Sequence, residues 1–91
     1  MYKVFRFSRE KDAILKQSRG FSFEDIITSI ENGWLIALEP HDNKEKYAHQ
    51  VILSVQMSDG IYTVPAVPEW DDTLFLKTAY RSRVATKRFN S

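Results

Sequence analysis

The first twenty residues show two successive patterns of hydrophobic and polar positions. Residues 2–7 interleave large apolar side chains with basic ones, which predicts a strand with one buried face. Good helix formers fill residues 9–18 directly after Ser8, a residue type that caps helix N-termini. Gly20 predicts the end of this helix, because glycine adopts the left-handed backbone conformation at low cost.

The segment from residue 21 to residue 33 carries the clearest local signal in the chain. Its SFED motif at residues 22–25 resembles a capping box, and Phe21 and Ile26 stand at the two positions of a hydrophobic staple. The apolar stripe of the predicted helix consists of Phe23, Ile26, Ile27 and Ile30. Gly33 follows as a stop signal, so we expect two short helices that form a compact hairpin or corner.

The rest of the chain is dominated by strand and turn signals. Apolar segments predict four strands, at residues 34–38, 51–57, 61–67 and 73–80. The polar residues 43–50 predict a loop, and Asp59-Gly60 favours a tight hairpin turn. Pro65 cannot donate a backbone hydrogen bond, so we expect an edge or a strand terminus near it.

The order of these elements predicts an α+β fold. An N-terminal strand and two short helices come first, then an antiparallel meander of four to five strands, and finally a short basic helix. We expect helices to cover one side of the sheet. Because no repeat, linker or low-complexity segment appears, we expect residues 1–91 to form a single domain.

Charge is distributed unevenly, although the net charge is only +1. The first twenty residues carry six basic and two acidic side chains, and the last eighteen carry five basic side chains and no acidic one. Residues 21–72 carry two lysines against ten carboxylates. If the fold brings the two basic ends together, one face of the molecule would bind phosphate groups.

Composition narrows the class of protein. With 43% hydrophobic and 13% aromatic residues, a chain of 91 residues can bury one core and is not of the disordered type. The absence of cysteine excludes disulfides and thiolate metal sites and fits a reducing compartment. The N-terminus lacks a signal-peptide pattern and every apolar run is short, so we expect a cytoplasmic protein without membrane association.

Two short motifs, one early and one late, resemble those of a known family. Gly20 and Phe21 precede SFED, and RSRVAT at residues 81–86 stands where that family has a strand running into S-A-R-x-A-[ST]. Together, at this chain length, they are similar to the BrnT-type toxins of bacterial type II toxin–antitoxin systems, within the RelE-like superfamily. The chain has Thr78 where an arginine is usual and Ser82 where an alanine is usual, which is typical of a divergent member.

The resemblance implies a RelE/BrnT-like fold and a toxin's function. The protein would be a metal-independent endoribonuclease, a hydrolase that cleaves RNA and arrests translation. Its partners would be the RNA substrate and a cognate antitoxin, usually a DNA-binding ribbon-helix-helix protein, and operator DNA would be bound only through that antitoxin. We expect no cofactor.

Five residues are candidates for the chemistry. RNA cleavage without a metal needs a base for the 2′-hydroxyl, cations for the phosphorane charge and an acid for the leaving 5′ oxygen. Arg83 is the first choice because its planar fork binds phosphate through two donors, with Arg81 and Lys77 as electrostatic support. Tyr80 can stack on a base or transfer a proton, and His41 can act as base or acid. The candidate RNA-binding cations are Arg6, Arg9, Lys87 and Arg88.

Each candidate also has a plainer interpretation. A single basic residue is as easily a solvated surface charge, Tyr80 a core or rim aromatic, and His41 a turn residue. His41 and His49 lie near Asp42 and Glu45 in sequence, but their spacing does not match a metal site, so we expect no metal.

The two tryptophans are predicted to have different surroundings. Trp34 leads an apolar strand and is predicted to lie in the core, whereas acidic neighbours make Trp70 a candidate for protein contact.

One alternative function is a catalytically inactive relative that binds protein or RNA. Another is a housekeeping α+β domain whose basic tail is only a solvated surface.

Overall fold

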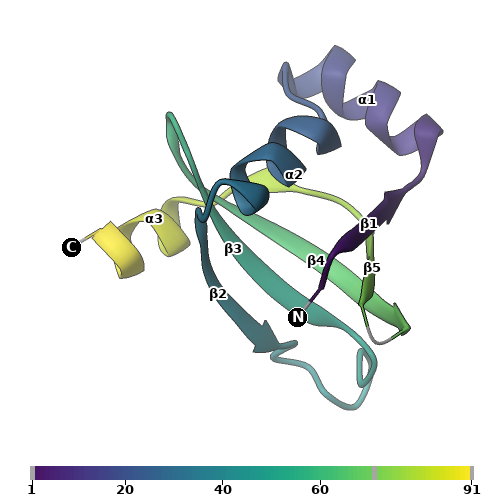
Figure 1. Ribbon diagram of the computed structural model, residues 1–91. Helices are drawn as coiled ribbons and strands as arrows, with labels where there is room; N and C mark the ends of the chain where they lie inside the picture. The colour runs from purple at the N-terminus through teal and green to yellow at the C-terminus, as the bar shows by residue number, and fades with distance from the viewer. Residues whose placement is uncertain (1, 71, 91) are drawn as a thin grey trace.

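The computed structural model describes residues 2–70 and 72–90, which form an α+β fold of three helices and six strands (Figure 1). The predicted α+β class is confirmed. In chain order the elements are β1 (Val4–Phe7), α1 (Arg9–Arg19), α2 (Phe23–Glu31), β2 (Leu35–Pro40), β3 (Val51–Met57), β4 (Gly60–Trp70), β5 (Thr73–Leu76), β6 (Tyr80–Arg81) and α3 (Arg83–Asn90). Among the described residues, no helix has the length and apolar character needed to cross a membrane.

The six strands form one mixed sheet. Its order is β1-β5-β4-β3-β2, and β6 pairs with β4. Strands β2 to β5 form the predicted antiparallel meander. The first strand departs from that prediction, because β1 pairs in parallel with β5, from Val4 opposite Thr73 to Phe7 opposite Leu76. The hydrophobic pattern of β1 indicates a buried face but does not specify the direction of a partner far away in the sequence.

The last predicted strand, residues 73–80, is interrupted. β5 ends at Leu76 and β6 begins at Tyr80, while β4 continues through Pro65 instead of ending there. Proline lacks a backbone donor but keeps its carbonyl oxygen, and the Pro65 carbonyl accepts a hydrogen bond of 2.9 Å from the Lys77 amide. This bond holds the tail on β4 between its two short strands.

The start and end signals of the first two helices act as predicted. The Ser8 hydroxyl accepts a hydrogen bond from the first turn of α1, and Gly20 ends that helix with a φ of 76°. Ser22 and Asp25 form a reciprocal capping box at the start of α2. Local sequence therefore fixes the corner between the two helices.

A buried carboxylate joins α1 to α2. Asp12 accepts a hydrogen bond of 2.8 Å from the backbone N–H of Phe23, and the Lys16 ammonium lies 3.0 Å from its other oxygen. Burial by itself raises the pKa of Asp12, but these two partners outweigh burial and lower the pKa below its usual value. The folded state thus favours the charged form of Asp12.

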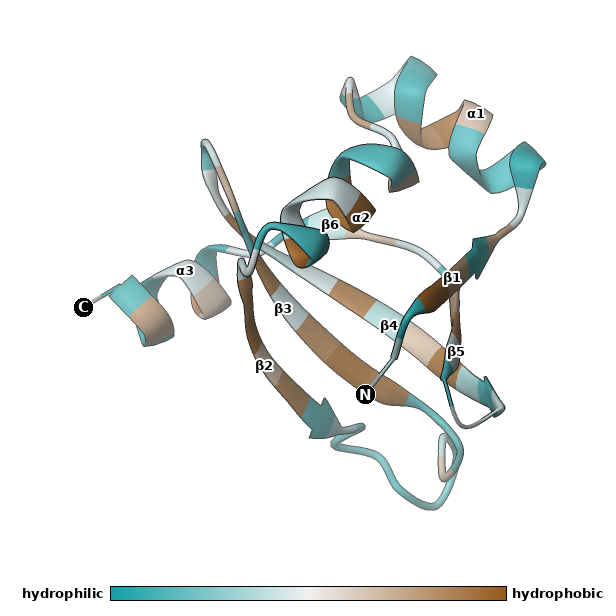
Figure 2. Ribbon diagram, viewed as in Figure 1, coloured by the Kyte–Doolittle hydropathy of each residue, from teal (hydrophilic) through white to brown (hydrophobic). Residues whose placement is uncertain are grey.

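The hydrophobic core lies between α1–α2 and one face of the sheet. Leu15 and Phe23 from the helices are almost fully buried against Leu53 of β3 and Val64 of β4. Figure 2 shows apolar residues along β3 beneath α2. Phe7 extends the core to β1 by stacking on Phe23, with 5.0 Å between the ring centroids.

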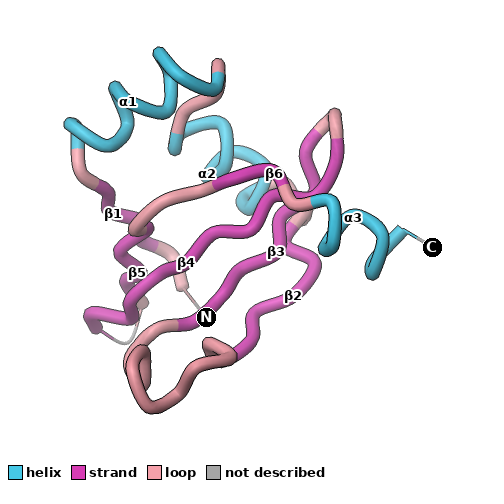
Figure 3. The backbone as a smooth tube through the Cα atoms, turned by 180° about the vertical axis from the view of Figure 1, so that it is seen from behind, coloured by secondary structure: helices cyan, strands magenta, loops and turns pink. Residues whose placement is uncertain are grey.

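The third helix covers the opposite face. Neighbouring residues of a strand point to opposite sides of a sheet, so Ser54 and Thr63 face away from the side to which Leu53 and Val64 contribute. Ser54 and Thr63 face α3 instead. Seen from behind, α1 and α3 lie at opposite ends of the molecule, as they do from the front (Figures 1 and 3).

Strand β2 is the outer strand at the end of the sheet farthest from β1. Within residues 2–70 and 72–90 it pairs only with β3, and the register shifts between Leu35 and Ala37. Ile36 and Leu38 are 42% and 40% exposed. Trp34, directly before β2, is 53% exposed, so its predicted place in the core is wrong. Its position beside an edge strand leaves the indole in contact with solvent.

Candidate functional site

A hollow of about 770 Å³ lies between α3 and the sheet face that α1 and α2 leave uncovered. We call it the α3 groove. Strands β3 and β4 provide its floor through Ile52, Ser54 and Thr63, and α3 provides one wall. The polar side chains that line the rest of the groove are those of Glu39, His41, Asp42, Lys44, Tyr80, Ser82 and Arg88. Two cations, two carboxylates, an imidazole and two hydroxyl groups therefore surround one opening.

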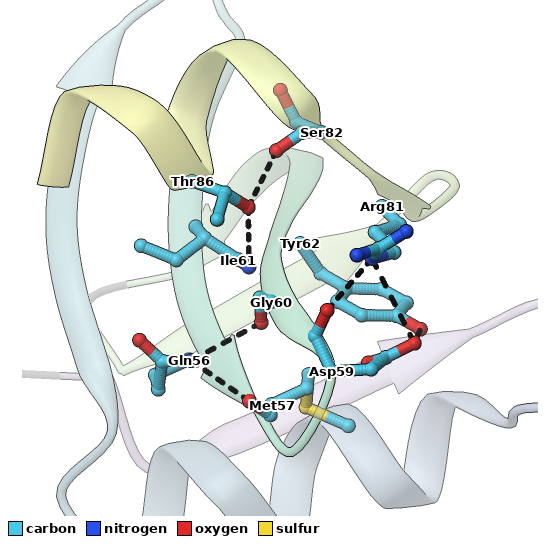
Figure 4. A network of polar contacts seen from close by, with 9 residues as sticks. All are labelled: Gln56, Met57, Asp59, Gly60, Ile61, Tyr62, Arg81, Ser82 and Thr86. Carbon is cyan, nitrogen blue, oxygen red and sulfur yellow. Dashed lines mark hydrogen bonds and ion pairs between the residues drawn. The ribbon is translucent and has the colours of Figure 1, made fainter. Parts of the chain in front are cut away.

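Hydrogen bonds at the start of α3 fix this wall of the groove (Figure 4). Ser82 caps the helix, since its hydroxyl accepts a hydrogen bond of 3.0 Å from the Ala85 amide. The Thr86 hydroxyl donates to the Ser82 carbonyl at 2.7 Å and accepts from the Ile61 amide at 2.8 Å. The Ser82 amide in turn donates to the Ile61 carbonyl at 2.9 Å. The first turn of α3 is thereby tied to the first residues of β4.

A glycine makes this close approach possible. Gly60 has a φ of 141°, and a Cβ atom there would lie 3.1 Å from both Arg81 Nε and Thr86 Oγ1. Any larger residue would be strained in its backbone and would press against two side chains that position α3. The hairpin predicted at Asp59-Gly60 is confirmed, and the glycine also serves the helix that packs on it.

Arg81 is held by the same hairpin. Its Nε donates a hydrogen bond of 2.8 Å to the Asp59 carbonyl and lies 3.8 Å from the Asp59 carboxylate (Figure 4). The same carboxylate accepts a hydrogen bond of 3.1 Å from the Tyr62 hydroxyl. Burial and this hydrogen bond both raise the pKa of Tyr62. Within the described part of the chain, Arg81 forms its hydrogen bond and its ion pair through Nε alone, which leaves its two Nη groups as donors.

An ion pair closes the far end of the α3 groove. Arg88 donates two hydrogen bonds of 2.9 Å to the two carboxylate oxygens of Glu39 on β2. The hydrogen bonds from Arg88 lower the pKa of Glu39, and those to Glu39 raise the pKa of Arg88. Because this pair joins α3 to the edge of the sheet, Arg88 has a structural partner as well as a place in the groove.

His41 presents one ring nitrogen to the protein and keeps the other available. Its Nδ1 accepts a hydrogen bond of 3.0 Å from the Asn43 amide, and its ring tilts against Tyr47 at 4.4 Å between centroids. In the neutral ring this places the proton on Nε2. His41 is therefore arranged as a hydrogen-bond donor to an anionic oxygen and not as a base.

Tyr80 stands where two hollows meet. Its side chain is 42% exposed and lines both the α3 groove and a second hollow of about 530 Å³. We call this second hollow the Arg19 hollow, and it is lined by Arg19, Phe21, Asp59, Tyr62, Tyr80 and Arg81. Arg19 donates a hydrogen bond of 3.1 Å to the carbonyl of Ala79, the residue before Tyr80. An exposed ring thus has guanidinium groups on one side and His41 on the other.

The structure brings some of the predicted catalytic residues together and leaves others apart. Tyr80 and Arg81 are adjacent on β6, and His41 lines the α3 groove with Tyr80. Arg83 begins α3 and Lys77 lies between β5 and β6; both are exposed, and neither forms an ion pair within residues 2–70 and 72–90. Neither lines the α3 groove or the Arg19 hollow.

The predicted RNA-binding cations are dispersed. Arg88 lines the groove and Lys87 is exposed on the same helix. Arg6 lies on β1, where it pairs with Glu69 at 2.8 Å, and Arg9 begins α1. Since α1 and α3 lie at opposite ends of the molecule (Figure 3), these four cations do not gather at one place. The two basic ends of the chain meet only where Arg19, at the end of α1, lines a hollow with Arg81 among the described residues.

Three residues of the site were not singled out by the sequence. Arg19, Glu39 and Asp59 acquire their places through contacts with Ala79, Arg88 and Arg81, which are distant along the chain. Residue type gave no signal for Glu39 or Asp59, which belong to the acidic middle of the chain. Arg19 could have been suspected only as a basic residue next to the glycine that ends α1.

Among the described residues, no group of three or more histidine, cysteine, aspartate or glutamate side chains is placed to hold a metal ion. No protein-family model matches the chain, and comparisons with curated proteins and with solved structures give no significant match.

Proposed function

We propose that this protein is the toxin of a toxin–antitoxin pair and cleaves single-stranded RNA without a metal in the α3 groove. The observation that carries the proposal is the position of Tyr80, an exposed aromatic ring between two hollows that both contain arginine. Aromatic rings that stack on bases, flanked by cations that bind the backbone, are the general means of holding single-stranded nucleic acid. The resemblance of the sequence to BrnT-type toxins in a RelE-like fold supports the same function.

The side chains divide the work as follows. Tyr80 stacks on a base at the junction, and the free Nη donors of Arg81 bind the phosphate next to it. Arg83, exposed two residues further on and outside the lining of both hollows, adds positive charge to the field that attracts the RNA strand. His41 donates from Nε2 to a phosphate oxygen on the α3 side. The hydroxyl of Tyr80, on the ring that contacts the strand, is the proton-transfer group in this proposal.

In this proposal the antitoxin contacts the acidic middle part of the chain through a basic segment of its own. A ribbon-helix-helix protein would carry operator DNA binding for the pair. The exposed Trp70, 66% accessible and next to the acidic Glu69 and Asp72, is a suitable contact for a basic segment of such a partner.

A second candidate function is an RNA- or protein-binding module without catalysis. The observation that favours it is that Arg88 and Arg81 both have carboxylate partners within the protein, at 2.9 Å and 3.8 Å. Cations that are already paired bind a phosphate less strongly than free ones do. Under this alternative the same groove binds RNA but leaves it intact.

Expression without a partner tests the first proposal against the second. Induced in bacteria, the wild-type protein should arrest growth, and the purified protein should cleave labelled single-stranded RNA equally well with EDTA and with magnesium. Tyr80→Ala should weaken RNA binding by roughly tenfold or more, the usual cost of losing one base stack. Arg83→Ala should relieve the growth arrest.

Lys3→Ala is the matched control, because it also removes one exposed charge but lies beside β1, at the far end of the sheet. It should behave like the wild type. Salt-sensitive RNA binding without cleavage would support the binding module instead. A wild-type protein that neither arrests growth nor binds RNA would contradict the toxin function and the RNA-binding form of the second function, and would leave only protein binding.

A further inference from the structure

The Arg19 hollow is separate from the α3 groove, and Tyr80 is the one described residue that lines both. Two arginines line it, from the end of α1 and from β6, together with one carboxylate, that of Asp59. Its other walls are aromatic, since Phe21 and Tyr62 meet edge to face with 4.8 Å between ring centroids. The hollow therefore offers guanidinium donors beside a rigid apolar surface.

Arg19 is positioned before any ligand arrives. Gly20 ends α1 directly after it, and its Nη1 donates to the Ala79 carbonyl at 3.1 Å. This bond anchors one edge of the guanidinium and leaves its other N–H groups as donors. Ala79 itself is fully buried, so the anchor is part of the rigid core.

The charges of the hollow do not cancel. Asp59 faces Arg81 at 3.8 Å and is also bonded to the Tyr62 hydroxyl, so its single negative charge is already shared. Within residues 2–70 and 72–90, Arg19 has no carboxylate partner. One positive charge in the hollow is left without a counterion from the described residues.

We propose that the Arg19 hollow is a phosphate-binding subsite for the RNA strand, on the side of Tyr80 away from α3, with Arg19 as its main donor. The inference rests on the proposed function, in which RNA crosses Tyr80. Stacking of a base on Tyr80 places the next phosphate beside the ring, where both arginines can reach it. Arg19 is a binding residue in this scheme, and it positions the strand for cleavage in the α3 groove.

The test measures RNA affinity at several salt concentrations. Arg19→Ala should weaken binding of a single-stranded oligoribonucleotide by about tenfold, because one charge-assisted contact is lost. The slope of log K against log salt should fall by about 0.7, the value for one phosphate contact on a single strand. Arg19→Lys keeps the charge and should retain most of the slope, and Lys3→Ala should leave both quantities unchanged.

A second variant should act in the opposite direction. Among the described residues that line the hollow, Asp59 is the one with a carboxylate. Asp59→Asn removes that charge, so binding should tighten by roughly twofold to fivefold, the range expected for one exposed charge interaction. The substitution retains a side-chain acceptor for Tyr62 and the backbone carbonyl that binds Arg81. Asn-Gly is also a favoured hairpin dipeptide, so the turn is preserved. A purely structural role for the hollow would not produce this gain.

The outcomes separate the inference from the function on which it rests. If the wild type binds RNA and Arg19→Ala binds equally well with an unchanged salt slope, the subsite is wrong while the function stands. If Arg19→Ala and Arg19→Lys lose affinity equally and both melt at a lower temperature, Arg19 acts only through the fold, which also overturns the subsite. If the wild type does not bind RNA, both fall.

Discussion

The side chain of Asp12 joins α1 to α2 at the helix corner. Asp12→Asn should lower the free energy of unfolding at neutral pH by about 1–2 kcal/mol, because the acceptor of the Phe23 N–H becomes neutral and the ion pair with Lys16 is lost. The pKa of Asp12 is lowered in the folded state, so its stabilisation is complete above the ordinary carboxylate pKa and disappears as pH falls through the lowered one. Urea unfolding of both proteins across this acidic range should show their stabilities converging.

Glu10→Gln is the control for Asp12→Asn. Glu10 is another acidic residue in the first turn of α1, but it is exposed. Its replacement tests the interaction with the helix dipole alone, worth about 0.3–1 kcal/mol. Equal losses for the two variants, or a difference that persists in acid, would show that the bond to Phe23 contributes little.

Gly60 is the residue on which the attachment of α3 depends. Gly60→Ala should cost about 1–3 kcal/mol for the backbone conformation, with a further loss from its clash with Arg81 and Thr86. Gly20→Ala is the matched variant, since its φ is also positive but its added Cβ would meet nothing within 4 Å. Thermal unfolding should rank Gly60→Ala well below Gly20→Ala. The reverse order would mean that the contacts at Gly60 yield easily.

At the scale of elements, α3 is held at both ends by different chemistry. Its first turn is fixed by hydrogen bonds to β4, and its last turn is fixed by the ion pair of Arg88 with Glu39. Because both side chains of that pair contact solvent, it is open to protonation and salt. We therefore expect the first turn of α3 to stay attached when pH or salt changes, and the last turn, which we call the adjustable end, to detach.

Acid should release the adjustable end. The hydrogen bonds from Arg88 lower the pKa of Glu39, so the pair persists above the usual glutamate pKa and is lost as pH falls through the lowered value. Backbone chemical shifts of residues 83–90 should move toward coil values over that range, more at the end of α3 than at its start. Arg88→Gln should show the loosened end at every pH. Shifts that follow pH equally in both proteins would assign the change to another group.

Elements with local signals were predictable, and their long-range partners were not. The SFED box, Gly20 and the Asp59-Gly60 turn encode their geometry within a few residues. The same holds for the four meander strands, which differ from their predicted bounds mainly in the interruption of the last one after Leu76 and the extension of β4 to Trp70. The parallel pairing of β1 with β5 has no local sequence signal, because the two strands lie near opposite ends of the sequence.

The candidate site follows the same rule. Tyr80, Arg81 and His41 were identified because their residue types carry chemistry, and two of them are neighbours in the chain. The pairing of Arg88 with Glu39 and the anchoring of Arg19 on Ala79 join residues far apart in the sequence. Charge counts treated all five tail cations alike, whereas the fold gives two of them carboxylate partners and leaves the side chain of Arg83 exposed.

At the scale of the whole molecule, the two faces of the sheet serve different purposes. One face is covered by α1 and α2 over the core (Figures 1 and 3). The other holds the α3 groove, which Tyr80 lines. Changes on α1 that spare Asp12 and Arg19 should therefore affect stability without affecting RNA binding. The concentration of polar groups on the α3 face explains how so small a chain can combine a closed core with an open site.

The edge strand β2 has a consequence for the behaviour of the protein at high concentration. Its exposed Ile36 and Leu38 and its outer backbone are the features that let sheets of separate molecules join and grow into aggregates. Two features interrupt such growth: the irregularity beside Leu35 at one end and Pro40, which has no backbone donor, at the other. Only a short regular stretch remains for an incoming strand. The six residues of β2 thus contain both the exposed apolar side chains that favour fibre formation and the backbone features that oppose it.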